Sequence, residues 1–332
     1  MRVTVLGAGA WGTTVAALLA GRHDTVLWAR DPETAREVDE THLNARYLGA
    51  NRLPESLGAT ADLERAVRGT ELLVVGVPTH GFRQVLTDLR PWLDSGVPVV
   101  SLSKGFEEGS LLRMTQVVED VLPGHPPAAL SGPNLAKEVI AGLAAASVLA
   151  AADPTVARGL QSVMRRGLFR IYTNHDVVGC ELGGALKNVV AIATGIAQGL
   201  SVGDNTRASV MTRGLAELTR LSLAMGGEAT TMAGLAGMGD LIATCMSPLS
   251  RNRGLGERLG AGEPLADVVA GSRSVFEGVR AAHAAHELAG RCGIEMPVCH
   301  EVHRVLSGEI PASAAYRGLK RHQHAGHEAE PG

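Results

Sequence analysis

The chain has 332 residues, 45% hydrophobic and 20% charged, which suffices for two domains with buried cores. Its 31 basic and 34 acidic residues give a net charge of −3, which argues against bulk binding of nucleic acid or attachment to anionic membranes. The four cysteines lack CxxC spacing and the N-terminus lacks signal-peptide features, so we expect reduced thiols and a cytoplasmic location. The longest apolar run, residues 139–152, is too short to span a bilayer, so no stable membrane insertion is expected.

The first half of the chain alternates short β-rich runs with helical patterns. Strands are expected at residues 2–7, 25–30, 72–78, 98–103, 128–132, 146–151 and 169–173. Helices are expected at residues 11–21, 80–90, 111–121 and 154–166. This alternation predicts parallel strands joined by crossover helices, and the continuous apolar strands indicate a sheet covered on both faces.

The segment GAGAWG at residues 7–12 is a GxGxxG pattern that follows the first strand and opens the first helix. Gly7 permits the tight turn, Gly9 lets the backbone approach a pyrophosphate, and Gly12 lets the helix pack on the strand. The helix N-terminus then faces the anion. A tight turn without a ligand is the alternative; the context favours dinucleotide binding.

The second expected strand ends with Arg30 and Asp31, about twenty residues beyond the glycines. Arg30 is placed to bind the 2′-phosphate of NADP, while NAD is not excluded. Asp31 has a second interpretation, because Asp31 followed by Pro32 is typical of a helix N-cap.

Two further strand ends present polar residues at the edge where doubly wound sheets bind ligands. One strand is followed by Lys104, and the next is followed by Gly132, Asn134 and Ala136. A surface lysine and a helix cap are the alternatives for Lys104 and Asn134. Their common edge favours a ligand contact for Lys104.

After residue 176 the strands stop and helices are expected at residues 177–200, 205–225, 251–260, 275–291 and 296–308. We therefore predict an α/β protein, a Rossmann-type doubly wound sheet in residues 1–178 followed by an all-α domain in residues 179–318. Residues 319–332 lack apolar periodicity and are expected to be a disordered tail.

Lys187 lies in the apolar helix ELGGALKNVVAIATG, next to Asn188. A partly desolvated lysine has a lowered pKa and can exchange a proton with a substrate oxygen, so we favour a catalytic role. The alternative is a lysine whose stem is buried and whose ammonium reaches water. Asp240 and Thr244, four residues apart and on one helical face, are expected to hold Lys187 in position.

The loop SPLSRNRG at residues 247–254 combines serine, arginine and asparagine. Arg251 can hold a phosphate by a forked salt link, and Asn252 can do so through its amide. An exposed basic turn is an equally weighted alternative.

Seven segments together resemble the bacterial NAD(P)-dependent glycerol-3-phosphate dehydrogenases over residues 1 to about 310. They are GAGAWGT, SKGFE, SGPNLAKEV, ELGGALKNVVAIATGI, NTRASVMTRGL, GLAGMGDLIATC and SPLSRNR. The resemblance implies the reversible reduction of dihydroxyacetone phosphate to sn-glycerol 3-phosphate with NADH or NADPH, supplying glycerol phosphate for phospholipid synthesis. Separately, the apolar helical half of the chain suggests subunit contacts, so we expect a homodimer, and we expect no metal site.

The resemblance also assigns residues. Lys187 matches the proton-transferring lysine, and Lys104 matches a lysine that touches both cofactor and substrate. The implied further substrate contacts are Gly132, Asn134, Asn188, Asp240, Ser250, Arg251 and Asn252. The implied cofactor contacts beyond the three glycines and Lys104 are Ala10, Trp11, Arg30, Ala136, Arg251, Val275 and Glu277. Asn134 replaces a usual serine or threonine, and Phe276 replaces a common alanine.

Two other functions remain open from the sequence. Another β-hydroxyacid-type dehydrogenase would share the cofactor domain, the helical lysine and an arginine that binds a carboxylate. A non-catalytic NAD(P)-binding sensor would need the glycine turn but not Lys187, Asp240 and the SRNR loop together.

Overall fold

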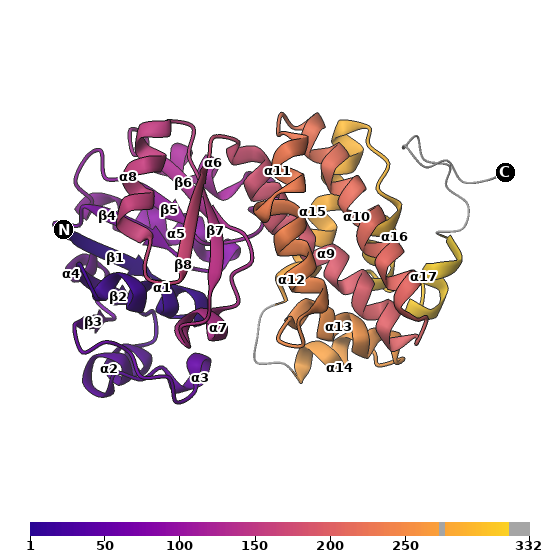
Figure 1. Ribbon diagram of the computed structural model, residues 1–332, viewed down its shortest axis with the longest axis horizontal. Helices are drawn as coiled ribbons and strands as arrows, with labels where there is room; N and C mark the ends of the chain where they lie inside the picture. The colour runs from indigo at the N-terminus through magenta and orange to yellow at the C-terminus, as the bar shows by residue number, and fades with distance from the viewer. Residues whose placement is uncertain (272–275, 319–332) are drawn as a thin grey trace. The chain divides into compact units, whose positions relative to one another are not determined.

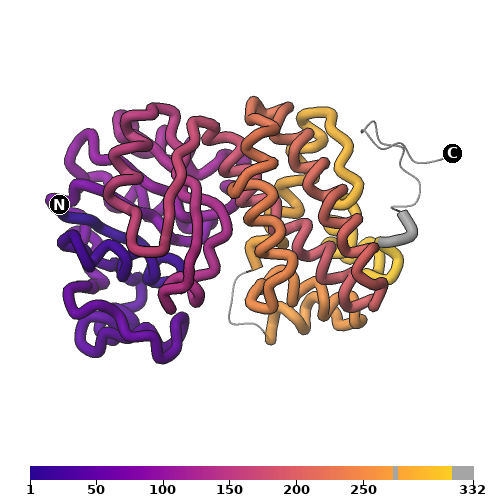
Figure 2. The backbone as a smooth tube through the Cα atoms, viewed as in Figure 1, coloured from indigo at the N-terminus to yellow at the C-terminus, as the bar shows by residue number. Residues whose placement is uncertain are grey.

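Residues 1–271 and 276–318 are described by a computed structural model of the chain and form two compact units (Figures 1 and 2). The first unit comprises Met1–Gly184 and Gly227–Asp240, and the second comprises Ala185–Gly226 and the chain from Leu241 onward. The boundary thus falls within a helix instead of at residue 178, and a segment of the later sequence joins the first unit. Val275 and the expected tail, 319–332, lie outside the described residues.

The first unit contains one eight-stranded sheet with the order β3-β2-β1-β4-β5-β6-β7-β8. The strands are β1 (Arg2–Leu6), β2 (Asp24–Trp28), β3 (Leu57–Thr60), β4 (Leu72–Val75), β5 (Val99–Ser101), β6 (Pro127–Ser131), β7 (Ala145–Ala150) and β8 (Phe169–Asn174). Strands β2 and β3 are added on one side of β1, and β4 and the strands after it are added on the other side. This reversal of strand order confirms the predicted doubly wound fold.

The prediction of an entirely parallel sheet is wrong at one pair, because β7 runs antiparallel to β6. The only helix between them is α7 (Ala136–Ile140), whose five residues are too few for a full crossover. The sequence reading also missed β3, an edge strand whose residues LGAT show no clear alternation.

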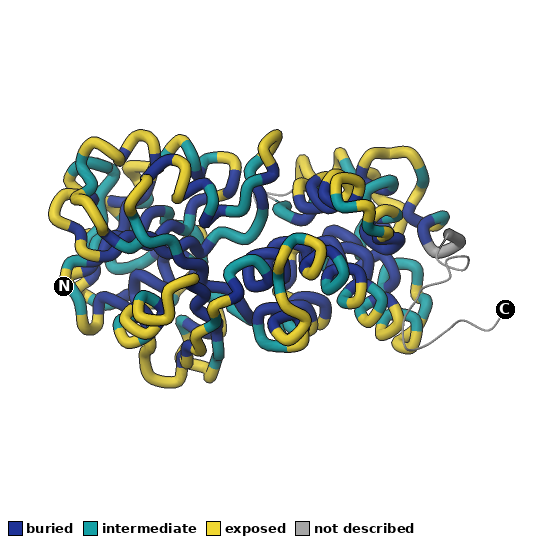
Figure 3. The backbone as a smooth tube through the Cα atoms, turned by 90° about the horizontal axis from the view of Figure 1, so that it is seen from above, coloured by how far each residue is buried: buried dark blue, intermediate teal, exposed yellow. Residues whose placement is uncertain are grey.

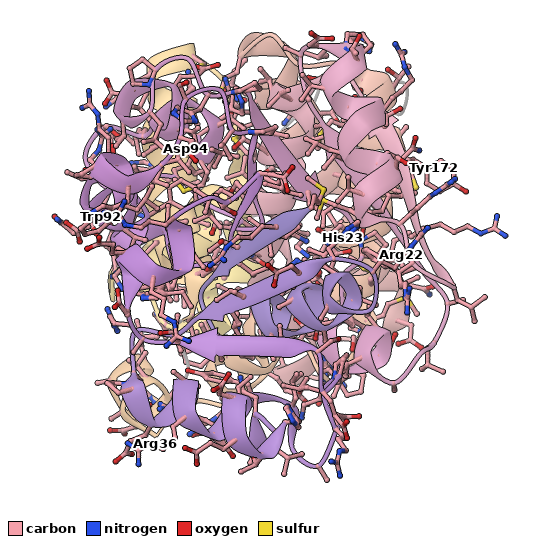
Figure 4. The ribbon with its side chains drawn as sticks, turned by 90° about the vertical axis from the view of Figure 1, so that its left-hand side faces the viewer. Arg22, His23, Arg36, Trp92, Asp94 and Tyr172 are labelled. Carbon is pink, nitrogen blue, oxygen red and sulfur yellow. The ribbon has the colours of Figure 1, made fainter. Side chains whose placement is uncertain are left out.

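Helices cover both faces of this sheet. One layer is formed by α1 (Ala10–Ala20), α2 (Pro32–Thr41), α7 and α8 (Pro154–Met164), and the other by α4 (Leu63–Val67), α5 (Thr79–Leu89) and α6 (Met114–Val121). Val3 and Val5 of β1 belong to the first core and Leu6 to the second, as the two-residue period of a strand requires. Figure 4 shows Arg22 and His23 on one side of the strands and Trp92 on the other.

The second unit is helical throughout its described residues. It contains the later part of α9 (Val177–Gly199) and α10 (Asp204–Ala224), α12 (Asp240–Met246), α13 (Arg251–Gly260), α14 (Leu265–Ala270), α15 (Glu277–Cys292), α16 (Pro297–Leu306) and α17 (Ala312–Gly318). Helix α9 is long and apolar enough to span a bilayer, but 89% of its apolar window is buried, as in a core helix. Figure 3 shows such buried backbone inside both units.

Helices α9 and α13 touch through their backbones. A Cβ atom on Gly195 of α9 would lie 2.0 Å from the carbonyl oxygen of Arg253. Conversely, a Cβ on Gly256 of α13 would lie 2.1 Å from the carbonyl oxygen of Ile192, and Gly199 and Gly260 are similarly crowded. Four glycines with i, i+4 spacing therefore allow this contact and place the start of α13 beside α9.

Glu217 of α10 is a buried carboxyl at the N-terminus of α16. It accepts the backbone N–H groups of Val298 at 2.7 Å and Cys299 at 3.1 Å, which the first turn of a helix leaves unpaired. Burial raises the pKa of Glu217 to about 7 despite these hydrogen bonds.

This raised pKa predicts a pH-dependent stability. Between the ordinary value of 4.5 and about 7, the folded chain retains a proton that the unfolded chain releases. Stability from Glu217 is therefore greatest below pH 4.5 and falls by roughly 3 kcal/mol as the pH rises to about 7. Urea unfolding at pH 5 and pH 8 should show a smaller difference for Glu217→Gln than for the native chain. An equal difference would contradict the assignment.

Candidate active site

The glycine turn has the geometry of a ligand-binding loop. Gly7 has φ +105°, and a Cβ there would lie 2.7 Å from the carbonyl oxygen of Gly76. A Cβ on Gly12 would lie 2.0 Å from the carbonyl oxygen of Gly7. Gly9, in contrast, has open space at its Cβ position among the described residues. It precedes Ala10, where α1 begins, and the first N–H groups of a helix have no partner within the helix.

Two side chains frame this turn. Trp11 packs edge-on against Phe169 with ring centroids 5.9 Å apart, and its buried indole Nε1 has no partner within the described chain. Asn44 holds the turn by donating from Nδ2 to the carbonyl oxygen of Ala8 and to Thr13 Oγ1, each at 2.9 Å. Asn44 lies far along the chain in no recognisable motif, so the sequence reading missed it.

Arg30 and Asp31 after β2 have different environments. Asp31 caps α2 and accepts the N–H of Glu33 at 3.2 Å and of Thr34 at 3.3 Å. The hydroxyl of Thr34 and these N–H groups lower the pKa of Asp31. The helix-cap interpretation of Asp31 is confirmed, while Arg30 is exposed and available to a 2′-phosphate.

Lys104, which is partly buried, and Asp240, which is buried, form an ion pair in the first unit. Lys104 Nζ donates to Asp240 Oδ2 at 2.6 Å and to the carbonyl oxygen of Gly132 at 2.9 Å. The exposed fractions of the two side chains are 15% and 1%, so the alternative of a surface lysine is wrong. Asp240 follows a π-helical turn, Leu235–Gly239, after α11 (Ala229–Ala233).

The loop after β6 carries the other predicted residues of this unit. Gly132 has φ +108°, which only glycine adopts easily. Asn134 Oδ1 accepts the hydroxyl of Ser147. Ala136 begins α7, and its carbonyl oxygen accepts a long hydrogen bond of 3.4 Å from Thr14 Oγ1 of α1. Ala136 therefore lies beside the helix that the glycine turn opens.

Glu181 and Asp176 anchor the first turns of α9. The buried Glu181 carboxylate accepts from Arg113 Nη1 at 2.6 Å and from the N–H of Thr115 at 3.0 Å. Burial raises the pKa of Glu181, and Arg113 opposes that shift. Asp176 caps the helix by accepting the N–H of Gly179 at 2.7 Å. The sequence reading gave Glu181 no role, although a carboxylate in an apolar helix is itself a signal.

Lys187 is buried in the second unit. Its ammonium donates to Thr244 Oγ1 at 2.7 Å, and Lys187 and Thr244 are 7% and 8% exposed. Such low exposure contradicts the alternative of an ammonium in bulk water. Asn188 is also buried, at 6% exposure. That Thr244 holds Lys187 is confirmed by this hydrogen bond, while orientation of Lys187 by Asp240 stays a prediction.

The predicted phosphate loop begins α13. Ser250 is the N-cap and accepts the N–H of Arg253 at 3.3 Å. Asn252 Oδ1 accepts the N–H of Gly278 at 3.2 Å, so the acceptor end of that amide is already used. Arg251 is exposed and lines a hollow with Leu255, Val268 and Phe276. Glu277, a predicted cofactor contact, is the first residue of α15.

The described residues contain no group of three or more His, Cys, Asp or Glu side chains arranged to hold a metal ion.

Both halves of the chain match models of a single family. The model of the NAD-dependent glycerol-3-phosphate dehydrogenase N-terminus matches residues 2–157, and that of the C-terminus matches residues 176–317. The chain belongs to the NAD-dependent glycerol-3-phosphate dehydrogenase family.

Curated relatives agree with this assignment to the glycerol-3-phosphate dehydrogenase family. The chain is 53% identical over its whole length to glycerol-3-phosphate dehydrogenase (NAD(P)+) 2 of Sphingopyxis alaskensis, covering 99% of that protein. It is 51% identical over 323 residues to a glycerol-3-phosphate dehydrogenase (NAD(P)+) of Mycobacterium avium, covering 96% of this chain and 94% of that protein.

Solved structures of glycerol-3-phosphate dehydrogenases share the fold. The enzyme of Coxiella burnetii has a TM-score of 0.92 at 37% identity and covers 97% of this chain and 99% of its own. The enzyme of Saccharomyces cerevisiae has a TM-score of 0.84 at 26% identity and covers 97% of this chain and 99% of its own. A ketopantoate reductase of Ralstonia eutropha, at 16% identity, shares the fold alone.

Proposed function

We propose that this chain catalyses the reversible, NAD(P)H-dependent reduction of dihydroxyacetone phosphate to sn-glycerol 3-phosphate, which supplies glycerol phosphate for phospholipid synthesis. The observation that carries the proposal is the buried ammonium of Lys187, held by the neutral hydroxyl of Thr244. A desolvated amine is suited to exchange a proton with a substrate oxygen. The family membership of both halves of the chain supports the substrate.

The first unit fits a nicotinamide dinucleotide. The open surface at Gly9 and the N-terminus of α1 suit a pyrophosphate, and the unpaired Nε1 of Trp11 offers a donor. The exposed Arg30 suits the 2′-phosphate of NADP, while NAD would not use it. When bound, the reduced nicotinamide supplies the hydride.

The chain's own residues would hold the substrate and move its proton. Lys187 gives a proton to the C2 oxygen of dihydroxyacetone phosphate as that oxygen gains negative charge. Lys104, which is held by Asp240 and the carbonyl oxygen of Gly132, is the residue that the family resemblance implies as a contact to both cofactor and substrate. Arg251, Asn252 and the N-terminus of α13 bind the phosphate group.

The decisive assay follows the oxidation of NADPH with dihydroxyacetone phosphate added or withheld. We expect oxidation only when this substrate is present, weaker or no NADPH oxidation with 2-keto acids, and weaker or no NADP+ reduction with 3-hydroxy acids. Preference for a carboxylate substrate would instead identify a β-hydroxyacid-type dehydrogenase. Cofactor binding without turnover on any substrate would identify a sensor.

We also propose a cytoplasmic homodimer. Its support is the exposed apolar surface on and after α12, where Ile242, Met246 and Leu249 are 43%, 68% and 47% exposed. The four free cysteines fit a reducing compartment. Light scattering after gel filtration should give twice the chain mass of 34.5 kDa, and the monomer mass would reject the dimer.

Arg251→Ala is expected to raise the KM for dihydroxyacetone phosphate by roughly 10- to 100-fold, because a charge-assisted phosphate contact is lost. Steady-state kinetics with saturating NADPH measures this change. Arg258→Ala is the matched control, since Arg258 lies on the same helix but pairs with Glu263 at 2.5 Å. An unchanged KM for Arg251→Ala would remove Arg251 from the phosphate site.

A further inference from the structure

The peptide bond between Ala8 and Gly9 lies in the middle of the glycine turn. Its carbonyl oxygen and its N–H point in opposite directions, because no cis peptide bond occurs among the described residues. The Gly9 N–H makes no hydrogen bond to another described residue, and the Cβ position of Gly9 faces open space. This N–H is therefore available to a negatively charged ligand oxygen.

A glycine at position 9 does not by itself determine which way this peptide faces. Gly9 has φ −73°, and turning the peptide over by 180° would give a positive φ, which glycine adopts about as readily. In the reversed peptide, the carbonyl oxygen of Ala8 would point where the N–H points now and would repel an anion. The residue that lets the backbone approach a pyrophosphate thus also lets the backbone present the wrong group.

Asn44 holds the peptide in one of these two orientations. Its side chain is 0% exposed, and Nδ2 donates to the carbonyl oxygen of Ala8 and to Thr13 Oγ1, each at 2.9 Å. The amide cannot be reversed without placing Oδ1 against the oxygen of Ala8, which can only accept. The amide keeps this orientation although Oδ1 then has no hydrogen-bond partner among the described residues.

The backbone of Asn44 is itself held in place. Asn44 immediately precedes α3 (Ala45–Leu48), and its carbonyl oxygen accepts the N–H of Leu48 at 2.8 Å. The carboxylate of Glu37 in α2 accepts the N–H of Ala45 at 3.3 Å. The donor is therefore anchored on elements other than the turn whose peptide it holds.

Resting on the proposed function, we propose that Asn44 is a positioning residue for the dinucleotide: by holding the carbonyl oxygen of Ala8, it directs the Gly9 N–H toward the pyrophosphate. The pyrophosphate is common to NAD and NADP, so the loss of Asn44 should weaken the binding of both. Arg30, which is placed to meet the 2′-phosphate, should matter for NADP alone.

Isothermal titration calorimetry with NADP+ and with NAD+ tests the proposal without turnover. Asn44→Ala should raise both Kd values by roughly 10- to 100-fold, because the peptide is then free to turn over. Arg30→Ala should raise the Kd for NADP+ only. Thr4→Val is the matched control, since Thr4 is also 0% exposed and donates to a backbone carbonyl oxygen, that of Ala66, at 2.6 Å. The control should lower the melting temperature and leave both Kd values unchanged.

Asn44→Asp separates the donated hydrogen from the volume of the side chain. The carboxyl group of this variant has nearly the shape of the amide but donates a hydrogen bond only when it is protonated. Burial beside a carbonyl oxygen should raise its pKa, so it should donate at pH 5 and not at pH 8. Compared with the native chain at the same pH, the Kd for NADP+ should be within about 3-fold at pH 5 and roughly 10-fold or more higher at pH 8.

Three results would overturn the inference. They are native Kd values for Asn44→Ala, weaker binding of NADP+ alone, or a Kd for Asn44→Asp that differs from the native value equally at both pH values. Equal weakening by Thr4→Val would also contradict it, because any loss of stability would then have the same effect. Failure of the proposed function looks different, because the native chain would bind NADP+ and yet not oxidise NADPH with dihydroxyacetone phosphate.

Discussion

Replacing Lys187 with methionine is expected to lower kcat by roughly 100- to 10,000-fold, because the group that moves the proton is removed while the buried volume is kept. Lys187 is 7% exposed and bound to Thr244, so water cannot readily substitute for its ammonium. The Kd for NADPH should stay unchanged, since the glycine turn belongs to the first unit. Steady-state turnover and fluorescence titration of NADPH measure the two effects.

Lys137→Met is the matched control, because Lys137 is an exposed lysine on α7. It should retain native kcat. A Lys187→Met protein that folds, binds NADPH and turns over at the native rate would remove Lys187 from the chemistry.

Gly256→Ala is expected to destabilise the protein by about 3 kcal/mol or more. The added methyl group would lie 2.1 Å from the carbonyl oxygen of Ile192, so α9 and α13 would have to separate. Because Arg251 and Asn252 begin α13, the KM for dihydroxyacetone phosphate should rise as well. Urea unfolding followed by circular dichroism gives the change in free energy of unfolding.

Gly254→Ala provides the control within the same helix. The Cβ position of Gly254 has no heavy atom within 4 Å among the described residues. Alanine favours a helix over glycine by about 0.5 to 1 kcal/mol, so this variant should be as stable as the native chain or more stable. Equal destabilisation by both substitutions would show that helix propensity, and not the contact with α9, decides the result.

Structural features that depend only on a short run of neighbouring residues were predicted correctly from the sequence. The glycine turn, the cap by Asp31 and the burial of Lys187 each follow from a short run of residues, and each has the expected geometry. The antiparallel β7 was missed because strand direction depends on the length of the connection, here one short helix, and not on the apolar pattern.

The partners of polar side chains were predicted less well. The ion pair between Asp240 and Lys104, which lie 136 residues apart, was not predicted, and the predicted orientation of Lys187 by Asp240 stays a prediction. Asn44 donates a hydrogen bond to the carbonyl oxygen of Ala8, and Ser147 donates one to Asn134. Neither pair belongs to a common sequence motif. Spacing along one helix indicates which side chains share a face, but only the folded sheet shows which loops meet there.

The glycine contact between α9 and α13 limits how this chain can change during evolution. At an apolar core position, one hydrocarbon side chain can be exchanged for another of similar volume, and neighbours adjust. At Gly195, Gly199, Gly256 and Gly260, every mutation adds atoms where a carbonyl group already lies, and no neighbouring side chain can shrink to make room. These four codons should therefore accept almost no amino-acid replacement, even in lineages whose remaining helical sequence has diverged widely.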